Sequence, residues 1–383
     1  MKKLVVVLFM LLIFPTSVFS TNKPLITTTF YTWFPSPHNN PDQLNSPASW
    51  IYTPPSLDGS NDISYWKRNL SDLSYAGING VFLVTGESGN FSYVKKAVDV
   101  AKDINSPLKF GMFIDQTNNF NSQTILQFYK LIPTSQWLTH TNRPIIMAWT
   151  QSNESIESIK NAFKTEFGIE PFFIFESETY QNLSNKQIAD SVFAWNSPIG
   201  GTVNLSINNF KVSSVGFGNN EQFIRPWRCT GDNPDDPVVN YKSRGGIDDP
   251  AQFIKTNFSN ITNDVDMVFV QDANELNEGT TFLRATNFPT TDNPIFDYCA
   301  PGYSFSMHKQ NPLLLQKVRD DYRATDNHKY LAENYYINIL RQLILSKFPQ
   351  KGPQSVDISY NSMIDIFDYN ILVSKFGNPY TIF

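Results

Sequence analysis

The 383-residue sequence is poor in the residues from which several common functional sites are built. It contains only two cysteines, Cys229 and Cys299, which excludes a cysteine-rich zinc site and a fold held by many disulfides. These two could form one bridge in an oxidising compartment or stay apart, and their spacing does not decide between the alternatives. None of the four histidines lies in a HExxH or HxH pattern. We therefore expect no histidine-built metal site and no cofactor for catalysis.

Positive charge and long apolar runs are also scarce. The formal net charge is -5 and there is no run of Lys or Arg, so the basic surface that nucleic acid requires is missing. The apolar run at residues 4–14 is shorter than the ~20 residues of a membrane-spanning helix. It follows Lys2 and Lys3 and precedes small residues, which predicts a signal peptide over residues 1–20. We expect a secreted, extracellular protein without a membrane span.

Several catalytic motifs are absent as well. The sequence has no GxSxG elbow, no Walker loop and no GxGxxG fingerprint. Carboxylate, amide and aromatic side chains remain in quantity, with aromatics at 14% of the residues. This set suits the binding and cleavage of carbohydrate.

Short apolar segments alternate with amphipathic segments along most of the chain. The pattern predicts strands over residues 27–34, 80–85, 108–114, 144–149, 172–175, 192–195, 212–217 and 267–271. It predicts helices over residues 63–76, 91–104, 125–132, 156–167, 249–261 and 330–345, and a short one near Ile188. This alternation favours an α/β fold of the (β/α)8 TIM-barrel type over residues 21–348. An open α/β sheet has the same local pattern, and only the strand order separates the two.

The most informative segment follows the predicted strand at residues 267–271. That strand runs into a polar cluster that contains Asn274, Glu275 and Glu278. Two glutamates three residues apart can project to one side of a helical turn, with Cβ atoms ~5–6 Å apart. Close carboxylates repel, so one keeps its proton and can act as an acid while the other stays ionised. Glycosidic-bond cleavage requires this division of roles. A hydrogen-bonded turn that merely ends the strand is the alternative.

The run NELNEGT at residues 274–280 resembles the NEWxEGT signature of the glycoside hydrolase family 99-like group, which contains the endo-α-mannosidases. Other segments resemble blocks of this family in the same order, namely residues 30–34, 76–81, 109–112, 143–146, 225–227 and 327–331. The resemblance extends from residue 27 to about residue 345. It implies a barrel enzyme, an O-glycosyl hydrolase, that acts on an α-linked, mannose-containing polysaccharide or glycan.

The resemblance also implies the roles of the two glutamates. Glu275 would deprotonate the sugar 2-hydroxyl, which attacks the anomeric carbon and forms a 1,2-anhydro sugar. Glu278 would protonate the leaving oxygen and then activate water, giving net retention. Several positions depart from the family pattern: Leu276 replaces its tryptophan, Asn277 replaces the usual aromatic residue or histidine before the second glutamate, and Thr32 replaces the proline of its opening strand. A catalytically inactive carbohydrate-binding barrel of the same fold is therefore the alternative. A related glycan-remodelling transferase is less compatible with export, because activated sugar donors are cytosolic.

Further candidates for contacts with the sugar lie near the ends of the predicted strands or in the family blocks. Carboxylates and amides would bind hydroxyls, and aromatic rings would stack on sugar rings. These substrate-binding candidates are Tyr31, Trp33, Glu87, Asp115, Trp149, Glu176, Trp195, Asn196, Arg225, Trp227 and Asn274. At each position, a residue that ends a strand or fills the barrel rim is the alternative.

The final segment, residues 349–383, begins with a linker-like PQKGP and resembles one half of a dockerin, a calcium-loop module. Its oxygen ligands for Ca²⁺ would be Asp357, Ser359, Asn361, Met363 (through its carbonyl), Asp365 and Asp368. Ser362 stands where the loop usually has glycine, and only one half-module is present. We therefore expect a short helical extension with a possible Ca²⁺ loop, and no cohesin-type partner.

Overall fold

The computed structural model describes residues 23–32, 63–84, 91–115, 120–150, 154–195, 201–216, 252–274, 282 and 335–349. Strands and helices alternate through the first part: β1 (Leu25–Tyr31), α3 (Ile63–Ala76), β2 (Gly80–Val84), α4 (Ser92–Asp103), β3 (Lys109–Ile114), α5 (Ser122–Lys130), η1 (Thr134–Gln136), β4 (Thr139–His140) and β5 (Arg143–Ala148). The chain continues with α6 (Ile156–Phe167), β6 (Phe172–Glu176), α7 (Ser177–Asn182), η2 (Lys186–Ile188), β7 (Ser191–Phe193), β8 (Thr202–Ile207), β9 (Phe210–Gly216), α10 (Gln252–Ser259), β10 (Met267–Gln271) and α13 (Tyr335–Lys347).

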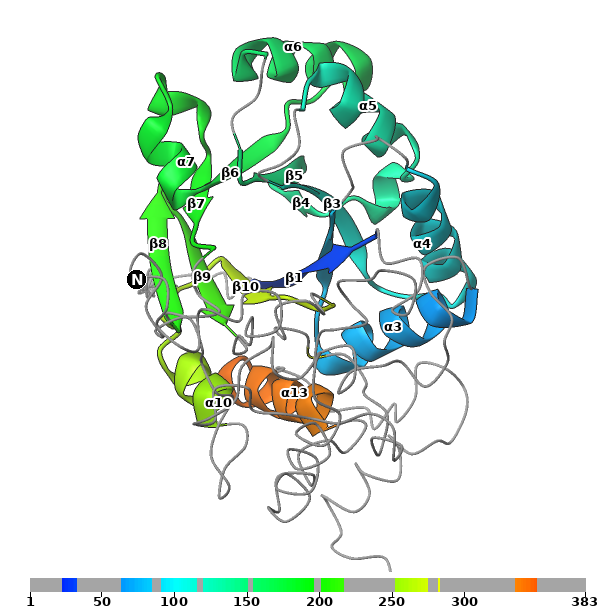
Figure 1. Cartoon of the computed structure of the whole chain (residues 1–383), viewed down its shortest axis with the longest axis vertical. Coiled ribbons are helices and arrows are strands. Elements are labelled where there is room, and N and C mark those ends of the chain that lie inside the picture. Colours follow the sequence, from blue (N-terminus) through cyan, green and yellow to red (C-terminus); the bar gives the residue numbers. More distant parts are fainter. Residues whose placement is uncertain are drawn as a thin grey trace, which may run out of the picture.

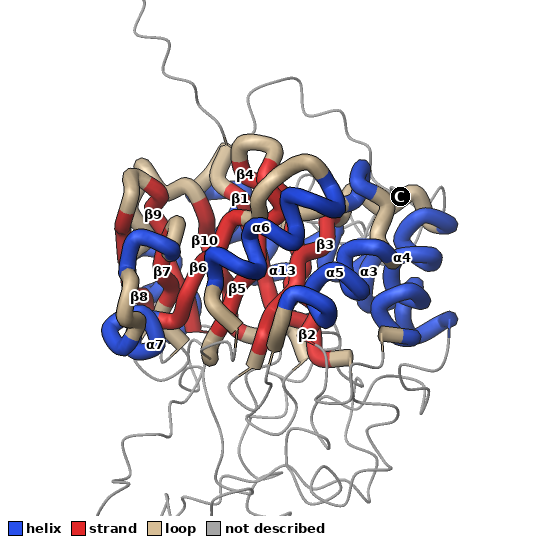
Figure 2. The backbone as a smooth tube through the Cα atoms, turned by 90° about the horizontal axis from the view of Figure 1, so that it is seen from above, coloured by secondary structure: helices blue, strands red, loops and turns tan. Residues whose placement is uncertain are grey.

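The strands form one sheet in the order β7-β6-β5-β3-β2-β1-β10-β9-β8, with β4 paired to β5. Every pairing from β7 to β9 along this path is parallel, whereas β8 and β4 pair with their neighbours in the antiparallel sense. The sheet curves into a nearly closed barrel with the helices on its outside (Figures 1 and 2). The fold is thus mixed α/β with a barrel-shaped sheet, and the open-sheet alternative is wrong.

The two described ends of the parallel part of the sheet meet at β7 and β9. The Ser191 hydroxyl donates to the Phe210 carbonyl at 3.0 Å, and the Ala194 amide donates to the Ser214 hydroxyl at 3.0 Å. Between β7 and β9, these hydrogen bonds from and to serine hydroxyls take the place of backbone–backbone hydrogen bonds. Along the described chain, an antiparallel strand stands between β7 and β9, where a simple (β/α)8 repeat has a helix.

Side chains alternate between the inside of the barrel and the layer under the helices, because successive strand residues point to opposite faces. The inner cluster includes Phe82, Phe113, Phe193 and Phe269, all buried. Gly111 leaves room for these rings, since a Cβ there would lie 2.8 Å from the ring of Phe82. The outer cluster packs the helices on the sheet and includes Trp66, Tyr129 and Phe163.

Local signals explain why several predicted elements are confirmed at their predicted bounds. The helix over residues 156–167 begins after Ser155, whose hydroxyl accepts from the Ser158 amide, and ends at Gly168 with φ 76°. The helix over residues 63–76 and the strand over residues 267–271 also match. Among the described residues, no helix has the length and apolar character needed to cross a membrane. Residues 1–22 and 350–383 lie outside the described part.

Two short hairpins were not among the predicted elements. The turn between β8 and β9 consists of Asn208 and Asn209, with φ 49° and 62°, and the turn between β4 and β5 consists of Thr141 and Asn142, with φ 48° and 63°. Asparagine tolerates this left-handed region better than most residues, so Asn-Asn between two apolar segments is the signal that indicates the β8–β9 turn.

Candidate functional site

Most candidate residues that the structure describes lie at one end of the barrel. Because the strands from β7 to β9 are parallel, their carboxyl ends meet at the same rim. Six predicted residues end these strands or lie within three residues after them: Tyr31, Asp115, Trp149, Glu176, Trp195 and Asn274. The structure thus gathers side chains that the sequence spreads over about 240 residues.

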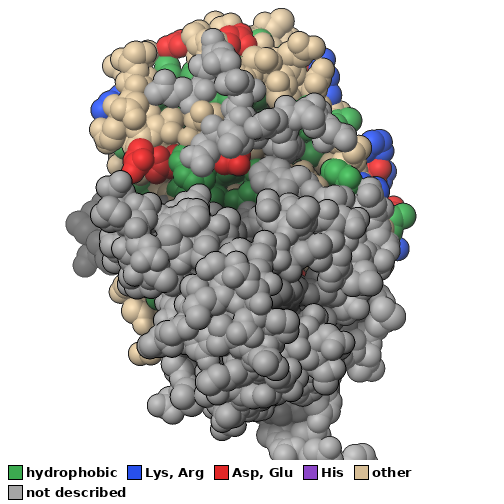
Figure 3. Space-filling model, viewed as in Figure 1, with side chains coloured by type: hydrophobic (Ala, Val, Ile, Leu, Met, Phe, Trp, Pro, Cys, Tyr) green, Lys and Arg blue, Asp and Glu red, His purple; other side chains and the backbone are tan. Residues whose placement is uncertain are grey.

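Aromatic rings line part of this rim. The indoles of Trp149 and Trp195 lie with ring centroids 4.5 Å apart and planes inclined by 31°, and both side chains are partly exposed. Trp195 also contacts Phe113 at 5.2 Å and Phe269 at 6.4 Å, which connects the rim to the interior of the barrel. In Figure 3, acidic side chains lie beside a hydrophobic patch on the described part of the visible face.

Glu176, at the end of β6, is buried and holds the start of α7. One carboxylate oxygen accepts from the amides of Glu178 and Thr179 at 2.6 and 3.1 Å, and the other accepts from the Ser177 hydroxyl at 2.7 Å. Both oxygens are therefore hydrogen-bonded within the α7 turn, the usual arrangement for a helix cap. A contact between Glu176 and a sugar stays a prediction.

Asn274, three residues beyond β10, is buried and joins the end of that strand to β1. Its Oδ1 accepts from the Tyr31 amide at 2.7 Å, and its Nδ2 donates to the Tyr31 carbonyl at 2.9 Å. The side-chain amide thus continues the pairing of β1 with β10 beyond their backbone ladder. Its Nδ2 also lies 3.5 Å from the hydroxyl of Tyr65. Burial raises the pKa of Tyr65 to about 12, against smaller lowering effects of the Asn274 hydrogen bond and the Arg68 charge.

Sequence reasoning did not include Thr29 or Asp272 among the site residues. Both are fully buried, and the Thr29 hydroxyl donates to the Asp272 carboxylate across β1 and β10. The peptide bond between Gln271 and Asp272 is cis. The sequence signal for a buried acid of this kind is a carboxylate immediately after an apolar strand. A buried acid requires a hydrogen-bond partner, which here is the Thr29 hydroxyl.

The other predicted site residues lie outside the described part of the chain. They are Trp33, Glu87, Asn196, Arg225, Trp227, Glu275 and Glu278, the six calcium ligands of the tail (Asp357, Ser359, Asn361, Met363, Asp365 and Asp368), and both cysteines. Their roles stay predictions.

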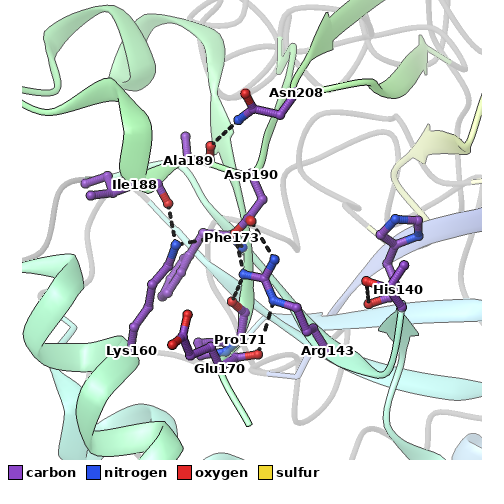
Figure 4. Close-up of polar contacts among 11 residues, drawn as sticks. His140, Arg143, Lys160, Glu170, Pro171, Phe173, Ile188, Ala189, Asp190 and Asn208 are labelled. Atoms are coloured by element: carbon purple, nitrogen blue, oxygen red, sulfur yellow. Dashed lines mark hydrogen bonds and ion pairs between the residues drawn. The ribbon is translucent and has the colours of Figure 1, made fainter.

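A second polar cluster lies at the opposite, amino end of the strands (Figure 4). The Arg143 guanidinium donates to both carboxylate oxygens of Asp190 at 2.7 and 2.9 Å, and to the Pro171 carbonyl at 2.6 Å. Asp190 also accepts from the Phe173 amide at 2.9 Å, and the ammonium of Lys160 lies 3.5 Å from it. This cluster ties the beginnings of β5, β6 and β7 together.

His140 is the histidine of this amino-end region. Its ring packs against Phe172 and Phe210, with centroid distances of 5.0 and 4.5 Å. Burial lowers its pKa from the ordinary value, and Arg143 acts in the same direction, while Asp266 and Asp190 raise it. The neutral form of the imidazole is therefore favoured in the folded protein.

Comparisons with known proteins agree with this architecture. Two solved structures of the GH99 endo-alpha-mannosidase from Bacteroides thetaiotaomicron, one in complex with bis-tris-propane, are similar to it. The structure in complex with bis-tris-propane has a TM-score of 0.56 and 15% sequence identity to this chain. The other structure has a TM-score of 0.57 and 13% identity. Each comparison covers 84% of this chain and 97% of the other. At such identities the likeness shows a shared glycoside hydrolase-like fold.

The sequence itself matches one family. Among curated proteins, no sequence is significantly similar to this chain. Residues 89–299, more than half of the chain, match the family described as "Domain of unknown function (DUF5010)". This match includes β3 to β10 and extends past the polar cluster that follows β10. The chain belongs to the DUF5010 family.

Proposed function

We propose that the protein is a secreted glycoside hydrolase that cleaves an α-linked, mannose-containing polysaccharide or glycan, with Glu275 and Glu278 as its carboxylate pair. One observation carries the proposal: the sequence NELNEGT begins at Asn274, whose amide is bound to the backbone of Tyr31 at the carboxyl end of the barrel. Residues that leave this end of the strands carry the chemistry in barrel enzymes. The likeness of the fold to endo-alpha-mannosidases supports the proposal.

In the proposed reaction the substrate supplies its own nucleophile. The carboxylate of Glu275 takes the proton of the sugar 2-hydroxyl, and that oxygen forms a bond to the anomeric carbon. Glu278 donates a proton to the leaving oxygen as its bond to the anomeric carbon breaks. Water, deprotonated by Glu278, then opens the 1,2-anhydro sugar, and Glu275 returns the proton to the 2-oxygen. Two inversions give net retention.

The experiment compares the wild type with Glu278→Gln and Glu275→Gln on α-mannan and aryl α-mannosides. Loss of either carboxylate should lower kcat by about 10²- to 10⁴-fold, since general acid–base groups contribute that much. Proton NMR of the first product should show the α-anomer. Wild type that binds these glycans without turnover would exclude the hydrolase.

A catalytically inactive carbohydrate-binding barrel is the second candidate. Leu276 favours it, because the resembled signature has a tryptophan at this position. Under this alternative, calorimetry shows the same glycan affinity for wild type and Glu278→Gln, and neither releases reducing ends.

The proposal extends to parts of the chain that the structure does not describe. Residues 1–20 would direct export, residues 21–348 would form one glycoside hydrolase-like barrel domain of the (β/α)8 type, and residues 349–383 would form the dockerin-like extension without a cohesin-type partner. Calorimetry of the full chain with calcium, compared with an Asp357→Ala, Asp365→Ala double variant, tests the metal loop. Equal heats for the two proteins would remove calcium from the proposal.

A further inference from the structure

The two tryptophans at the carboxyl rim are packed differently. Four aromatic rings contact Trp195: Trp149 at 4.5 Å, Phe113 at 5.2 Å, Phe269 at 6.4 Å and Phe193 at 6.5 Å. Among the described residues, Trp149 has Trp195 as its one ring partner, and its side chain is partly exposed. Both indoles are partly exposed, but Trp195 is held by four aromatic rings, whereas Trp149 has a single ring contact and so has more of its aromatic face available to a ligand.

Trp149 is also held firmly by its backbone. Its amide donates to the Ile114 carbonyl at 2.8 Å, and its carbonyl accepts from the Thr179 hydroxyl at 2.9 Å. Thr179 lies in α7, whose first turn is fixed by the carboxylate of Glu176. Contacts from β3 and α7 therefore fix the backbone of Trp149, and Trp195 packs on its indole before any ligand binds, which lowers the entropy cost of binding.

The strand order places Trp149 across the barrel from the strand that precedes the glutamates. Around the nearly closed sheet, β5 is four strands from β10 through β1, β2 and β3, and four strands from it through β9, β7 and β6. β5 carries Trp149, and β10 leads to Asn274, which the sequence follows with Glu275. A ligand bound between the two sides would meet the indole of Trp149 on one side and the end of β10, marked by Asn274, on the other.

Two acidic residues lie on the strands that flank β5. Asp115 follows β3 and Glu176 ends β6, and both strands pair directly with β5. Carboxyl groups on both neighbouring strands disfavour an anionic ligand at the indole. The surroundings of Trp149 therefore suit an uncharged sugar.

We propose that Trp149 is the stacking platform for one neutral pyranose of the glycan, and that Trp195 is a positioning residue that holds this platform. The C–H bonds on one face of a pyranose pack on the apolar face of the indole. The inference rests on the proposed function. It adds that the bound sugar is a neutral pyranose and that Trp149 is the residue that selects it.

The test measures binding of neutral α-mannan oligosaccharides by calorimetry in the Glu278→Gln background, so that the ligand is not consumed. Trp149→Ala should weaken binding by about 10- to 100-fold, comparable with the loss of other ring-stacking contacts. Trp149→Phe should lose less, because a smaller ring remains. Oligosaccharides rich in uronic acid should bind more weakly than neutral ones.

Tryptophan fluorescence distinguishes the platform from its support. The change in emission on adding glycan should disappear in Trp149→Phe and persist in Trp195→Phe. The buried Trp137→Phe serves as the matched control for the loss of one indole. Near-UV circular dichroism and thermal unfolding identify any variant that fails to fold.

The outcomes separate the two proposals. If the wild type binds and cleaves the glycan and Trp149→Ala behaves like it, the platform is wrong while the function stands. If Trp195→Phe loses the fluorescence response and Trp149→Phe keeps it, the assigned roles are wrong. If the folded wild type neither binds nor cleaves any tested glycan, both proposals fall.

Discussion

At the amino end of the barrel, Arg143 and Asp190 pair with each other and with the nearby backbone, whereas at the carboxyl end two partly exposed indoles, Trp149 and Trp195, pack on each other. The amino-end cluster places a carboxylate among cationic groups, amides and carbonyls, so its polar atoms stabilise the fold. The carboxyl end presents acids and aromatic rings to solvent. In barrel enzymes, stability and chemistry are divided between the two ends in the same way.

The comparison also holds within the carboxyl end itself. Asn274 and Glu176 bind backbone groups there, as Asp190 does at the other end. Partly exposed Trp149 follows β5, which pairs with β6, so it lies next to Glu176 at the rim. A polar residue at the end of a strand can therefore support the site through its hydrogen bonds without touching the ligand.

The largest effect on stability is expected at the amino end. Asp190→Ala removes both hydrogen bonds from the Arg143 guanidinium to a carboxylate and the acceptor of the Phe173 amide, which leaves a partly buried charge without its carboxylate. Urea unfolding should show a loss of about 3 kcal/mol. The matched control, Asp99→Ala, breaks an exposed pair with Lys95 and should cost less than about 0.5 kcal/mol.

This variant also tests the division between the two ends. At a temperature where Asp190→Ala remains folded, its affinity for glycan should equal that of the wild type. A large loss of affinity would contradict the separation of stability from function.

A smaller loss of stability with a larger loss of function is expected at the carboxyl end. Asn274→Asp preserves the shape of the side chain but removes the donor to the Tyr31 carbonyl and places a carboxylate in a buried position. Unfolding measurements should show a cost of about 2 kcal/mol, and activity should fall, because the end of β10 is no longer fixed.

Asn161→Asp provides the control for this change. Its side chain is exposed on α6, so its effect on stability should stay within about 0.5 kcal/mol. Full activity in a folded Asn274→Asp protein would show that the amide does not position the site.

The smallest effect is a dependence on pH at the amino end. The pKa of His140 is lower in the folded protein than in the unfolded chain, chiefly because of burial. The unfolded chain therefore binds more protons, so the stability from neutral His140 is present above the ordinary pKa of about 6.5 and is lost as pH falls below it. Urea midpoints at pH 7.5 and pH 5.0 should differ less in His140→Phe than in the wild type. Equal differences would exclude His140 as the cause.

Sequence periodicity was sufficient for the elements that pack by their own pattern. The helices at residues 63–76 and 156–167 have one apolar face and clear termini, and the strand at residues 267–271 is continuously apolar. The predicted strand at residues 27–34 corresponds to Leu25–Tyr31, since its register is set by pairing with β2 and β10. The hairpin strand β8 was missed because its alternating polar pattern is weak without its partner.

The location of the candidate site could be predicted from the sequence, but the hydrogen bonds within the site could not. Strand ends followed by carboxylates and indoles are visible in the sequence, and parallel pairing brings them to one rim. The roles of Glu176 and Asn274 were not visible, because each depends on which backbone groups the fold brings within hydrogen-bond distance. The amino-end pair of Arg143 and Asp190 depends in the same way on contacts 47 residues apart.

The link between Asn274 and Tyr31 also bears on the order of folding. It joins residues 243 positions apart, so it cannot form until the chain between them has been synthesised and the first and last described strands of the barrel have met. Closing so long a loop costs conformational entropy before the contact repays it, which places such contacts late in folding. A partly folded or truncated chain would thus lack this link at the rim, so the candidate site would be complete only in the finished barrel.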